Sequence, residues 1–510
     1  MQAVEKLPIL KMRRSLSAAD GDLFRAPKWL TDSYEDPAGF WHRYLDVFSQ
    51  HGGVASHARY DEGYDFYHDL VTRYQDDTAL AFIHWHANRG VERLSYQNLH
   101  ARCRALECAW REAGVNAGDA LAIVLPIGVN YVVSLLTALK MGLCFVSVPM
   151  LGNRFAQGCI DQGHLDWWVT EDRYLHGLEV EAERLPLSCH DSGSGGGADR
   201  SYFYEATEVV GSVFSPVQDL QDGPVEVSAQ TLFLGLIRDA AIGLSLDRGD
   251  VIAAPGFCPI QFQPTILLTT LAAGATFVEF SETQAQAQTP ELEQFGFTHL
   301  LLQPLTRDAL VRNQLAAVPK LKRWFRNAHG ALDWNRWDQF SKLAKSQSCL
   351  GSTYFANAAA GGAIMTGVSR LQPKYMHVLP MPGSGFTMAD ANLSGMPTVT
   401  ESGVLEWSEY SNSDLLIGHQ LVSRDRNEFV LIGPVRPHRE GQSYPGEAVT
   451  NLVESHPGVT HARVVFAPAA SAGSGWRAIV VVFVEPDGDW FNDRKSLATA
   501  LSLQCKVELG

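Results

Sequence analysis

The sequence predicts an α/β protein, with a large N-terminal domain of twisted sheets flanked by helices and a small α+β domain at the C-terminus. Strand-like and helix-like segments alternate over the first four fifths of the chain, a pattern typical of largely parallel sheets. Near the end, two strand-like runs, VVFAP and AIVVVFVEP, follow a stretch rich in proline and glycine. We therefore expect an N-terminal extension over residues 1–59, a large domain over 60–433 and a small domain over 434–510.

Composition limits the classes of partner. The chain has 510 residues, of which 46% are hydrophobic and 19% charged, and this balance is sufficient for a large buried core. A net charge of -15 argues against a nucleic-acid surface, because such binding needs clustered lysine and arginine. The eight cysteines form no CxxC pair and no zinc-type spacing, so we expect no metal site and a reducing, cytoplasmic location.

The first half of the chain gives the clearest element predictions. Residues 1–22 are basic but lack the apolar core and cleavage site of a secretory signal, which predicts a flexible or docking extension. Leu94–Gly114 has apolar residues at helical spacing, with Gly114 as a stop. Ala120–Pro149 is the most apolar region, but Pro126 and Gly128 interrupt it. Membrane spans need about 20 uninterrupted apolar residues, so we expect a buried strand, a helix and a second buried strand.

Later segments continue the alternation. His190–Ser201 is rich in glycine and serine and is predicted to be a flexible surface loop. Val251–Phe280 and Phe297–Asn313 again combine strand-like and helix-like runs. The composition changes at Leu431–Glu447, which predicts a linker before the small domain.

Three segments carry a resemblance to a known family. They are LSYQNLHARCRALECAWREAGVNAGDALAIVLPIGVNYVVSLLTALKMGLCFVSVP, the later PMPG, and SYPGEAVTNLVESHPGVTHARVV near the C-terminus. In this order they resemble the adenylate-forming (ANL) superfamily, which includes acyl-CoA synthetases and other AMP-binding enzymes, from about Gly63 to the end. The resemblance implies a reaction in which a carboxylate attacks the α-phosphate of ATP, and a thiol or amine then displaces AMP from the acyl adenylate.

The glycine-rich phosphate loop that the resemblance implies is degenerate. It aligns with VFSPVQDLQDGPVEVS, where Ser215 matches the first serine of the loop and no lysine is present. Pro216 has no N–H to donate to a phosphate, and the acids that follow place negative charge where a triphosphate would lie.

The other ATP positions implied by the resemblance also differ from the family. Ala359, or Tyr354 in an alternative register, stands where a glutamate would bind Mg²⁺. His419 replaces the ribose-binding aspartate, and Pro434 replaces the hinge arginine. The sequence ends at CKVELG, before the loop that carries the adenylation lysine. We therefore expect no ATP or Mg²⁺ binding by the family mechanism. Pro434 and Pro437 also predict a stiff hinge.

The acyl-binding region matches the family better, with Phe257, Phe262 and Gln263 as candidate pocket residues. Cys258 stands where many relatives have a histidine. One hypothesis makes Cys258 a thiolate, or His419 a base, for thioester exchange. The alternative is that Cys258 is a small buried apolar residue and that His419 is a loop histidine without an orienting partner.

Three functions remain open at this point. The first is transfer of an acyl or aryl thioester between coenzyme A and a carrier protein in a fatty-acid, polyketide or other specialised-metabolite pathway. The second is a non-catalytic scaffold of such a pathway, and the third is an acyl-CoA or acyl-carrier ligase with an unusual ATP site. The ligand we expect is a coenzyme A thioester. The basic, aromatic segment Lys320–Phe340 is either a docking surface for an acyl carrier protein or a helix whose aromatic residues pack on the large domain.

Overall fold

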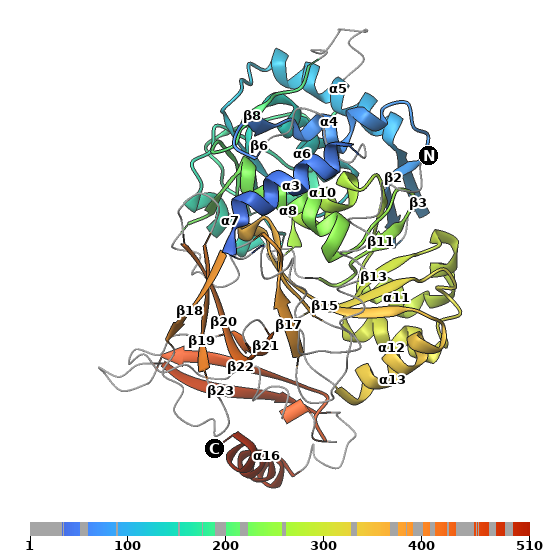
Figure 1. Ribbon diagram of the computed structural model, residues 1–510, viewed down its shortest axis with the longest axis vertical. Coiled ribbons are helices and arrows are strands. Elements are labelled where there is room, and N and C mark those ends of the chain that lie inside the picture. Colours follow the sequence, from blue (N-terminus) through green and yellow to red (C-terminus); the bar gives the residue numbers. More distant parts are fainter. Residues whose placement is uncertain are drawn as a thin grey trace.

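The structure of the chain is a computed structural model, drawn in Figure 1. It describes residues 33, 35–50, 60–87, 90–150, 153–175, 177–188, 200–214, 223–257, 262–327, 334–367, 376–383, 385–390, 401–408, 414–425, 428–434, 453–454, 456, 458–468, 476–484 and 493–509.

The largest sheet contains β2 (Leu80–His86), β3 (Gly90–Ser95), β11 (Val251–Ala253), β12 (Thr276–Glu279), β13 (His299–Leu302), β14 (Arg323–Asn327), β15 (Leu350–Asn357), β16 (Gly362–Gly367), β17 (Met376–Pro380), β18 (Gly385–Asp390), β19 (Glu401–Ser408), β20 (Asp414–Asp425) and β21 (Glu428–Pro434). These 13 strands follow the order β18-β19-β20-β21-β17-β16-β15-β14-β13-β11-β12-β2-β3. The middle of the sheet, from β15 to β2, is parallel, and both flanks are antiparallel.

A second sheet contains β4 (Ala120–Ile123), β5 (Cys144–Ser147), β6 (Trp167–Val169), β7 (Glu183–Arg184), β9 (Val209–Val213) and β10 (Val225–Ser228). Its order is β10-β9-β5-β4-β6-β7, and every neighbouring pair except β9 and β10 is parallel. A short antiparallel pair joins β1 (Gly63–Tyr64) to β8 (Tyr204–Glu205).

The helices are α3 (Pro37–Gln50), α4 (Phe66–Leu70), α5 (Tyr96–Glu112), α6 (Val129–Met141), α7 (Asn153–Gln162), α8 (Ala229–Arg238), α10 (Thr265–Ala272), α11 (Glu282–Ala287), α12 (Pro304–Arg312), α13 (Trp334–Ser346) and α16 (Arg494–Leu509). Shorter helical turns cover Thr72–Tyr74, Asp172–Tyr174, Asp239–Gly243, Thr289–Phe295 and Ala358–Ala360. The predicted α/β fold is therefore confirmed.

The apolar region Ala120–Pro149 folds as predicted, with parallel strands β4 and β5 on either side of helix α6. Almost every residue of α6 is buried, which explains why this helix is apolar on all faces. In the part of the chain that the structure describes, no helix is both long and apolar enough to cross a membrane.

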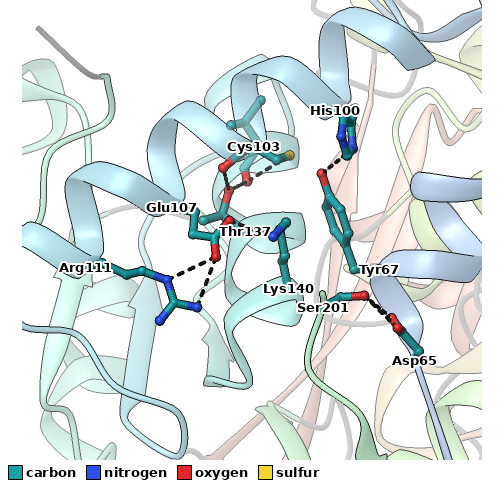
Figure 2. A network of polar contacts seen from close by, with 10 residues as sticks. Asp65, Tyr67, His100, Cys103, Glu107, Arg111, Thr137, Lys140 and Ser201 are labelled. Atoms are coloured by element: carbon teal, nitrogen blue, oxygen red, sulfur yellow. Dashed lines mark hydrogen bonds and ion pairs between the residues drawn. The ribbon is translucent and has the colours of Figure 1, made fainter. Parts of the chain in front are cut away.

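A polar network ties α4, α5 and α6 together (Figure 2). Lys140 Nζ lies 2.6 Å from Glu107 Oε2, and both side chains are buried. Arg111, one turn after Glu107, binds the other carboxylate oxygen at 3.0 Å. The Tyr67 hydroxyl hydrogen-bonds His100 Nδ1 at 3.1 Å, and Lys140 lies over the Tyr67 ring. Lys140 belongs to the KMGLCFVSVP motif, so this motif residue has a packing role.

The aromatic segment Lys320–Phe340 does not form one helix. Its first part is strand β14, and α13 begins at Trp334. The Trp324 and Trp337 rings stack with centroids 5.6 Å apart, and the Phe340 ring meets Trp324 edge-on. All three side chains are buried in a cluster on the face of the large sheet that α11, α12 and α13 cover. The packing alternative therefore accounts for the aromatic residues.

The basic residues of this segment are separated from one another. The Arg326 side chain is buried, and its Nε donates to Thr353 Oγ1 at 2.7 Å. Lys322 pairs with Asp250 at 2.7 Å. The four basic residues near the start of this segment, Lys320, Lys322, Arg323 and Arg326, therefore do not form one continuous exposed patch.

Helix α3 belongs to the folded body, although it lies within the predicted N-terminal extension. Trp41 is fully buried, and its indole N–H donates to the carbonyl oxygen of Gly383 at 2.8 Å. Phe40 and Tyr44 stack beside it, with ring centroids 5.2 Å apart. Residues 1–32 lie outside the described part of the chain.

The two strand-like runs predicted near the C-terminus are strands, and they form an antiparallel pair. They are β22 (His461–Pro468) and β23 (Trp476–Phe483). Val480 and Val482 pack with Leu497 and Leu501 of α16 in a small separate core. Gly433 and Pro434 end strand β21, and the remaining predicted hinge residues, through Pro437, lie outside the described residues. The domain boundary at 433 stays a prediction.

Candidate functional site

The structure brings two of the predicted pocket residues together. Phe257 follows strand β11 and Phe262 precedes helix α10; both are buried, with ring centroids 4.6 Å apart. Tyr354 of β15 stacks on Phe262 at 5.9 Å. Cys258, which lies between the two phenylalanines in sequence, is outside the described residues.

Gln263 is buried beside this aromatic group. Its Nε2 atom meets no partner at full hydrogen-bond geometry among the described residues, but its amide lies close enough to the Tyr131 hydroxyl to act on it. The Tyr131 hydroxyl nearby hydrogen-bonds Ser147 at 3.1 Å. Burial raises the pKa of Tyr131, and the hydrogen-bonding groups of Ser147 and Gln263 oppose that shift. The site therefore contains a polar donor within an otherwise apolar environment.

Neither magnesium position implied by the resemblance offers a carboxylate. Ala359 lies in the turn after β15, fully buried, with its N–H donating to Asn357 Oδ1 at 3.0 Å. The Tyr354 hydroxyl donates to Asp239 Oδ2 at 3.0 Å. Because Mg²⁺ needs oxygen ligands of the carboxylate type, these residues do not fit a bound magnesium ion.

The one carboxylate beside Tyr354 is enclosed by protein donors. Asp239 is fully buried, and besides Tyr354 it accepts from the Ala363 N–H at 2.5 Å and from Arg238 Nε at 3.1 Å. Burial raises the pKa of Asp239, while the Arg238 charge opposes the shift. Asp239 therefore serves to hold the start of β16 against α8, and its oxygens are already bound.

Helix α8 and the turn around Ala359 touch through their backbones. A Cβ atom added to Gly235 would lie 2.3 Å from the carbonyl oxygen of Gly361. A Cβ atom on Gly361 would lie 2.4 Å from the carbonyl oxygen of Thr231. This packing leaves no room for a larger residue at either glycine.

Of the remaining residues that the resemblance assigns to ATP binding and the hinge, the structure describes only the backbone of His419 and Pro434. Ser215 and Pro216 lie outside the described residues, between the paired strands β9 and β10. His419 of β20 is the register partner of Pro434 in β21. The position that the resemblance assigns to the ribose and the position that it assigns to the hinge are thus neighbours across a β-ladder. The side chain of His419 lies outside the description.

Two titratable residues on the neighbouring strands β12 and β2 were not predicted from the sequence. Glu279 ends β12, and His84 is its register partner in β2. Burial raises the pKa of Glu279 to about 8. Burial, with His86 beside it, lowers the pKa of His84 to about 4. The sequence does contain a signal for both residues, because the strand-like runs TFVE and LAFIHWH place Glu279 and His84 among apolar neighbours.

The sequence matches the family described as AMP-binding enzyme over residues 68–155, a segment that contains Glu107, Lys140 and strands β4 and β5. A comparison with curated protein sequences finds no match.

Solved structures share the fold. A benzoate CoA ligase from Burkholderia xenovorans aligns with a TM-score of 0.65 and 16% identity, covering 88% of this chain and 94% of that one. O-succinylbenzoate coenzyme A synthetase (MenE) from Bacillus subtilis, in complex with AMP, aligns with a TM-score of 0.66 and 12% identity over 87% and 92%. McyG A-PCP complexed with phenylalanyl-adenylate gives 0.68 and 10% over 88% and 78%. The chain therefore matches the AMP-binding enzyme family over residues 68–155 and, over most of its length, shares the fold of these ligases and of McyG A-PCP.

Proposed function

We propose that the protein transfers an acyl or aryl group between thioesters, from coenzyme A to a carrier-protein thiol, without forming an adenylate. The observation that carries this proposal is the contrast between the two halves of the site. The aromatic residues Phe257, Phe262 and Tyr354 form a compact apolar group. The positions that the family uses for Mg²⁺ and phosphate hold Ala359 and Pro216.

An aromatic or otherwise planar acyl group suits this site. Aromatic side chains favour stacked and edge-on contacts with other rings. Benzoate and O-succinylbenzoate are the substrates named for two structures of the same fold. We therefore propose an aryl thioester as the first class to test, with Phe257, Phe262 and Gln263 as its contacts.

A carrier protein is the proposed acceptor. McyG A-PCP, a structure of the same fold, contains a carrier module by its name. An acidic carrier requires basic surface on this chain, and Lys320 and Lys322 are exposed where β14 begins. Cys258 as nucleophile and His419 as base remain the candidate catalytic residues from the sequence, in a cytoplasmic, reducing setting.

The test is a transfer assay with two arms. The protein is mixed with benzoyl-coenzyme A and a holo carrier protein, without ATP, and the carrier mass is followed by mass spectrometry. A parallel reaction contains benzoate, ATP, Mg²⁺ and coenzyme A, and released pyrophosphate is measured. Cys258→Ser and Phe262→Ala are compared with the wild type, and Glu183→Gln, on the exposed strand β7, is the control.

Transfer without ATP, lost in Phe262→Ala, supports the proposal. Pyrophosphate release in the second arm would restore an ATP-dependent ligase. Binding of benzoyl-coenzyme A in calorimetry without any transfer would leave a scaffold that holds a thioester.

A further inference from the structure

Gln263 connects the carboxyl edges of the two large sheets. It lies in the segment that leads from strand β11 to helix α10. Tyr131 is near the start of α6, the helix that follows β4, and Ser147 is the last residue of β5. The Tyr131 hydroxyl lies 3.1 Å from Ser147 Oγ, and the Gln263 amide is close enough to act on this hydroxyl. Ligands of parallel α/β sheets bind outside the carboxyl ends of the strands, so Gln263 lies on the ligand side of both sheets.

The backbone holds Gln263 directly beside the aromatic group. Gln263 follows Phe262, whose ring contacts Phe257 at 4.6 Å and Tyr354 at 5.9 Å between centroids. The Thr265 hydroxyl, at the first residue of α10, donates to the carbonyl oxygen of Phe262 at 3.1 Å. This hydrogen bond closes the turn that contains Gln263, so the amide is attached to a backbone that is fixed relative to the Phe262 ring.

The amide of Gln263 is an expensive group to bury at this place. Only 3% of the residue is exposed, and Nε2 meets no partner at full hydrogen-bond geometry among the described residues. A buried donor without such a partner has lost its hydrogen bonds to water and lowers the stability of the fold. A ligand that brings an acceptor oxygen to Nε2 would offset this cost.

The aromatic group itself presents ring surface. The side chains of Phe257 and Phe262 carry no polar atom. The Tyr354 hydroxyl is directed to Asp239, to which it donates at 3.0 Å, so Tyr354 offers its ring to Phe262. Around these three rings, the donor that the described residues leave for a ligand is therefore the Gln263 amide. An acyl group that fits both features has an apolar ring and one acceptor oxygen.

We propose that the Gln263 amide determines specificity by donating a hydrogen bond from Nε2 to an oxygen substituent on the aryl ring, an assignment that rests on the function proposed above. The substrate class is then a hydroxylated aryl thioester, whose ring packs on Phe257 and Phe262. Gln263, Tyr131 and Ser147 are all neutral. A hydroxyl substituent therefore suits this position better than a carboxylate, whose charge would be buried without a counter-ion.

A methyl group is the sharpest comparison for the hydroxyl. The two substituents are similar in size, but a methyl group supplies no acceptor, so the Gln263 donor stays unpaired when a methylbenzoyl group is bound. Sites built to hydrogen-bond a substrate hydroxyl reject analogues without it for this reason. We expect the hydroxyl to be favoured by roughly 10- to 100-fold in binding at the ring position that reaches Nε2.

The test measures binding apart from turnover. Dissociation constants of the ortho, meta and para isomers of hydroxybenzoyl-coenzyme A and methylbenzoyl-coenzyme A are measured by calorimetry, without a carrier protein or ATP. The wild type should prefer the hydroxyl compound at one ring position. Gln263→Met keeps an unbranched side chain but removes the donor, and it should abolish this preference and bind the methyl compound more tightly. Gln347→Met, at an exposed position after α13, is the matched control and should behave as the wild type.

Two further readouts separate specificity from damage to the fold. In the transfer assay, Gln263→Met should raise KM for the hydroxybenzoyl thioester and leave kcat unchanged, because the ring contact is the same in the ground and transition states. Damage to the fold would instead weaken both thioesters equally. Without ligand, Gln263→Met and Gln263→Leu should melt no lower than the wild type, because both remove a buried donor that lacks a full partner.

The outcomes distinguish this assignment from the proposed function. Equal dissociation constants for the hydroxyl and methyl compounds at all three ring positions would refute the role of Gln263, and transfer of either group would leave the proposed function standing. Lower melting temperatures for both Gln263 variants would assign the amide to the Tyr131 hydroxyl and refute the role as well. Selective binding of a hydroxybenzoyl thioester without any transfer would overturn the proposed function and support the specificity of the site.

Discussion

At the scale of single residues, the acids Asp239 and Glu279 have opposite surroundings. Asp239 accepts from Tyr354, Ala363 and Arg238, so its oxygens are used to join α8 to β15 and β16. Glu279 has no such donors among the described residues and keeps part of its surface accessible. The carboxyl group of Asp239 is thus held by protein donors, whereas that of Glu279 is held in its neutral form by burial, which raises its pKa to about 8.

His299 gives a prediction for stability in mild acid. The ring is buried between Thr298 and Asp250, with Nδ1 2.9 Å from Thr298 Oγ1, and burial lowers the pKa of His299 to about 4. In the unfolded chain the pKa of histidine is about 6.5, so the unfolded state binds more protons and stability falls as the pH drops from about 6.5 to about 4. His299→Gln should lose less stability than the wild type between pH 7 and pH 5 in urea unfolding. His164→Gln, at an exposed position, should lose as much as the wild type. Identical losses in all three proteins would contradict the assignment.

At the scale of elements, charge is buried where helices meet. Helices α5 and α6 are joined by the Glu107–Lys140 pair, whose side chains have 0% and 2% of their surface exposed. Two desolvated charges cost several kcal/mol each unless both remain paired. This pair therefore fixes how α6 sits on α5, within the segment that matches the AMP-binding family.

Replacement of one residue of the Glu107–Lys140 pair should lower the stability of the protein, because the other charge stays buried. Lys140→Met leaves Glu107 with Arg111 as its charged neighbour, and we expect a loss of about 3–5 kcal/mol in the free energy of unfolding. The double variant Glu107→Leu/Lys140→Met should recover most of that loss, because no buried charge is left unpaired. Chemical denaturation of Lys140→Met, Glu107→Leu and the double variant measures the differences. A double variant as unstable as the sum of the two single variants would show that the pair is not coupled.

At the scale of the whole molecule, the sequence predicted those parts in which local pattern decides the structure. Ala120–Pro149 folds as strand, helix and strand because its apolar runs and breaks are local. The Asp239–Tyr354 contact joins residues 115 positions apart, and no local pattern specifies it. The environment of Glu279 likewise depends on β2 and β11, which are distant in sequence. Helix α3 was missed for the same reason, since its role depends on the contact between Trp41 and Gly383.

The relation between the large and small domains gives a further prediction. Pro434 and Pro437 restrict the backbone of the predicted hinge. We therefore expect trypsin to cut after Arg439 more slowly than after Arg200, which ends a glycine-rich stretch that composition predicts to be a flexible surface loop. Mass spectrometry of timed digests identifies the order of cuts. Cleavage after Arg439 that is as fast as cleavage after Arg200, with or without benzoyl-coenzyme A, would contradict a stiff hinge.

The backbone contact between Gly235 and Gly361 also constrains how this protein can evolve. Each glycine lies where a Cβ would overlap a carbonyl oxygen of the facing segment, so neither position tolerates even alanine unless α8 moves away. A lineage that keeps this packing must retain both glycines, and a lineage that loses one must first remodel the neighbouring turn. Position 359, in the same turn, is equally enclosed, because Ala359 is fully buried and any larger side chain there would need the surrounding residues to move.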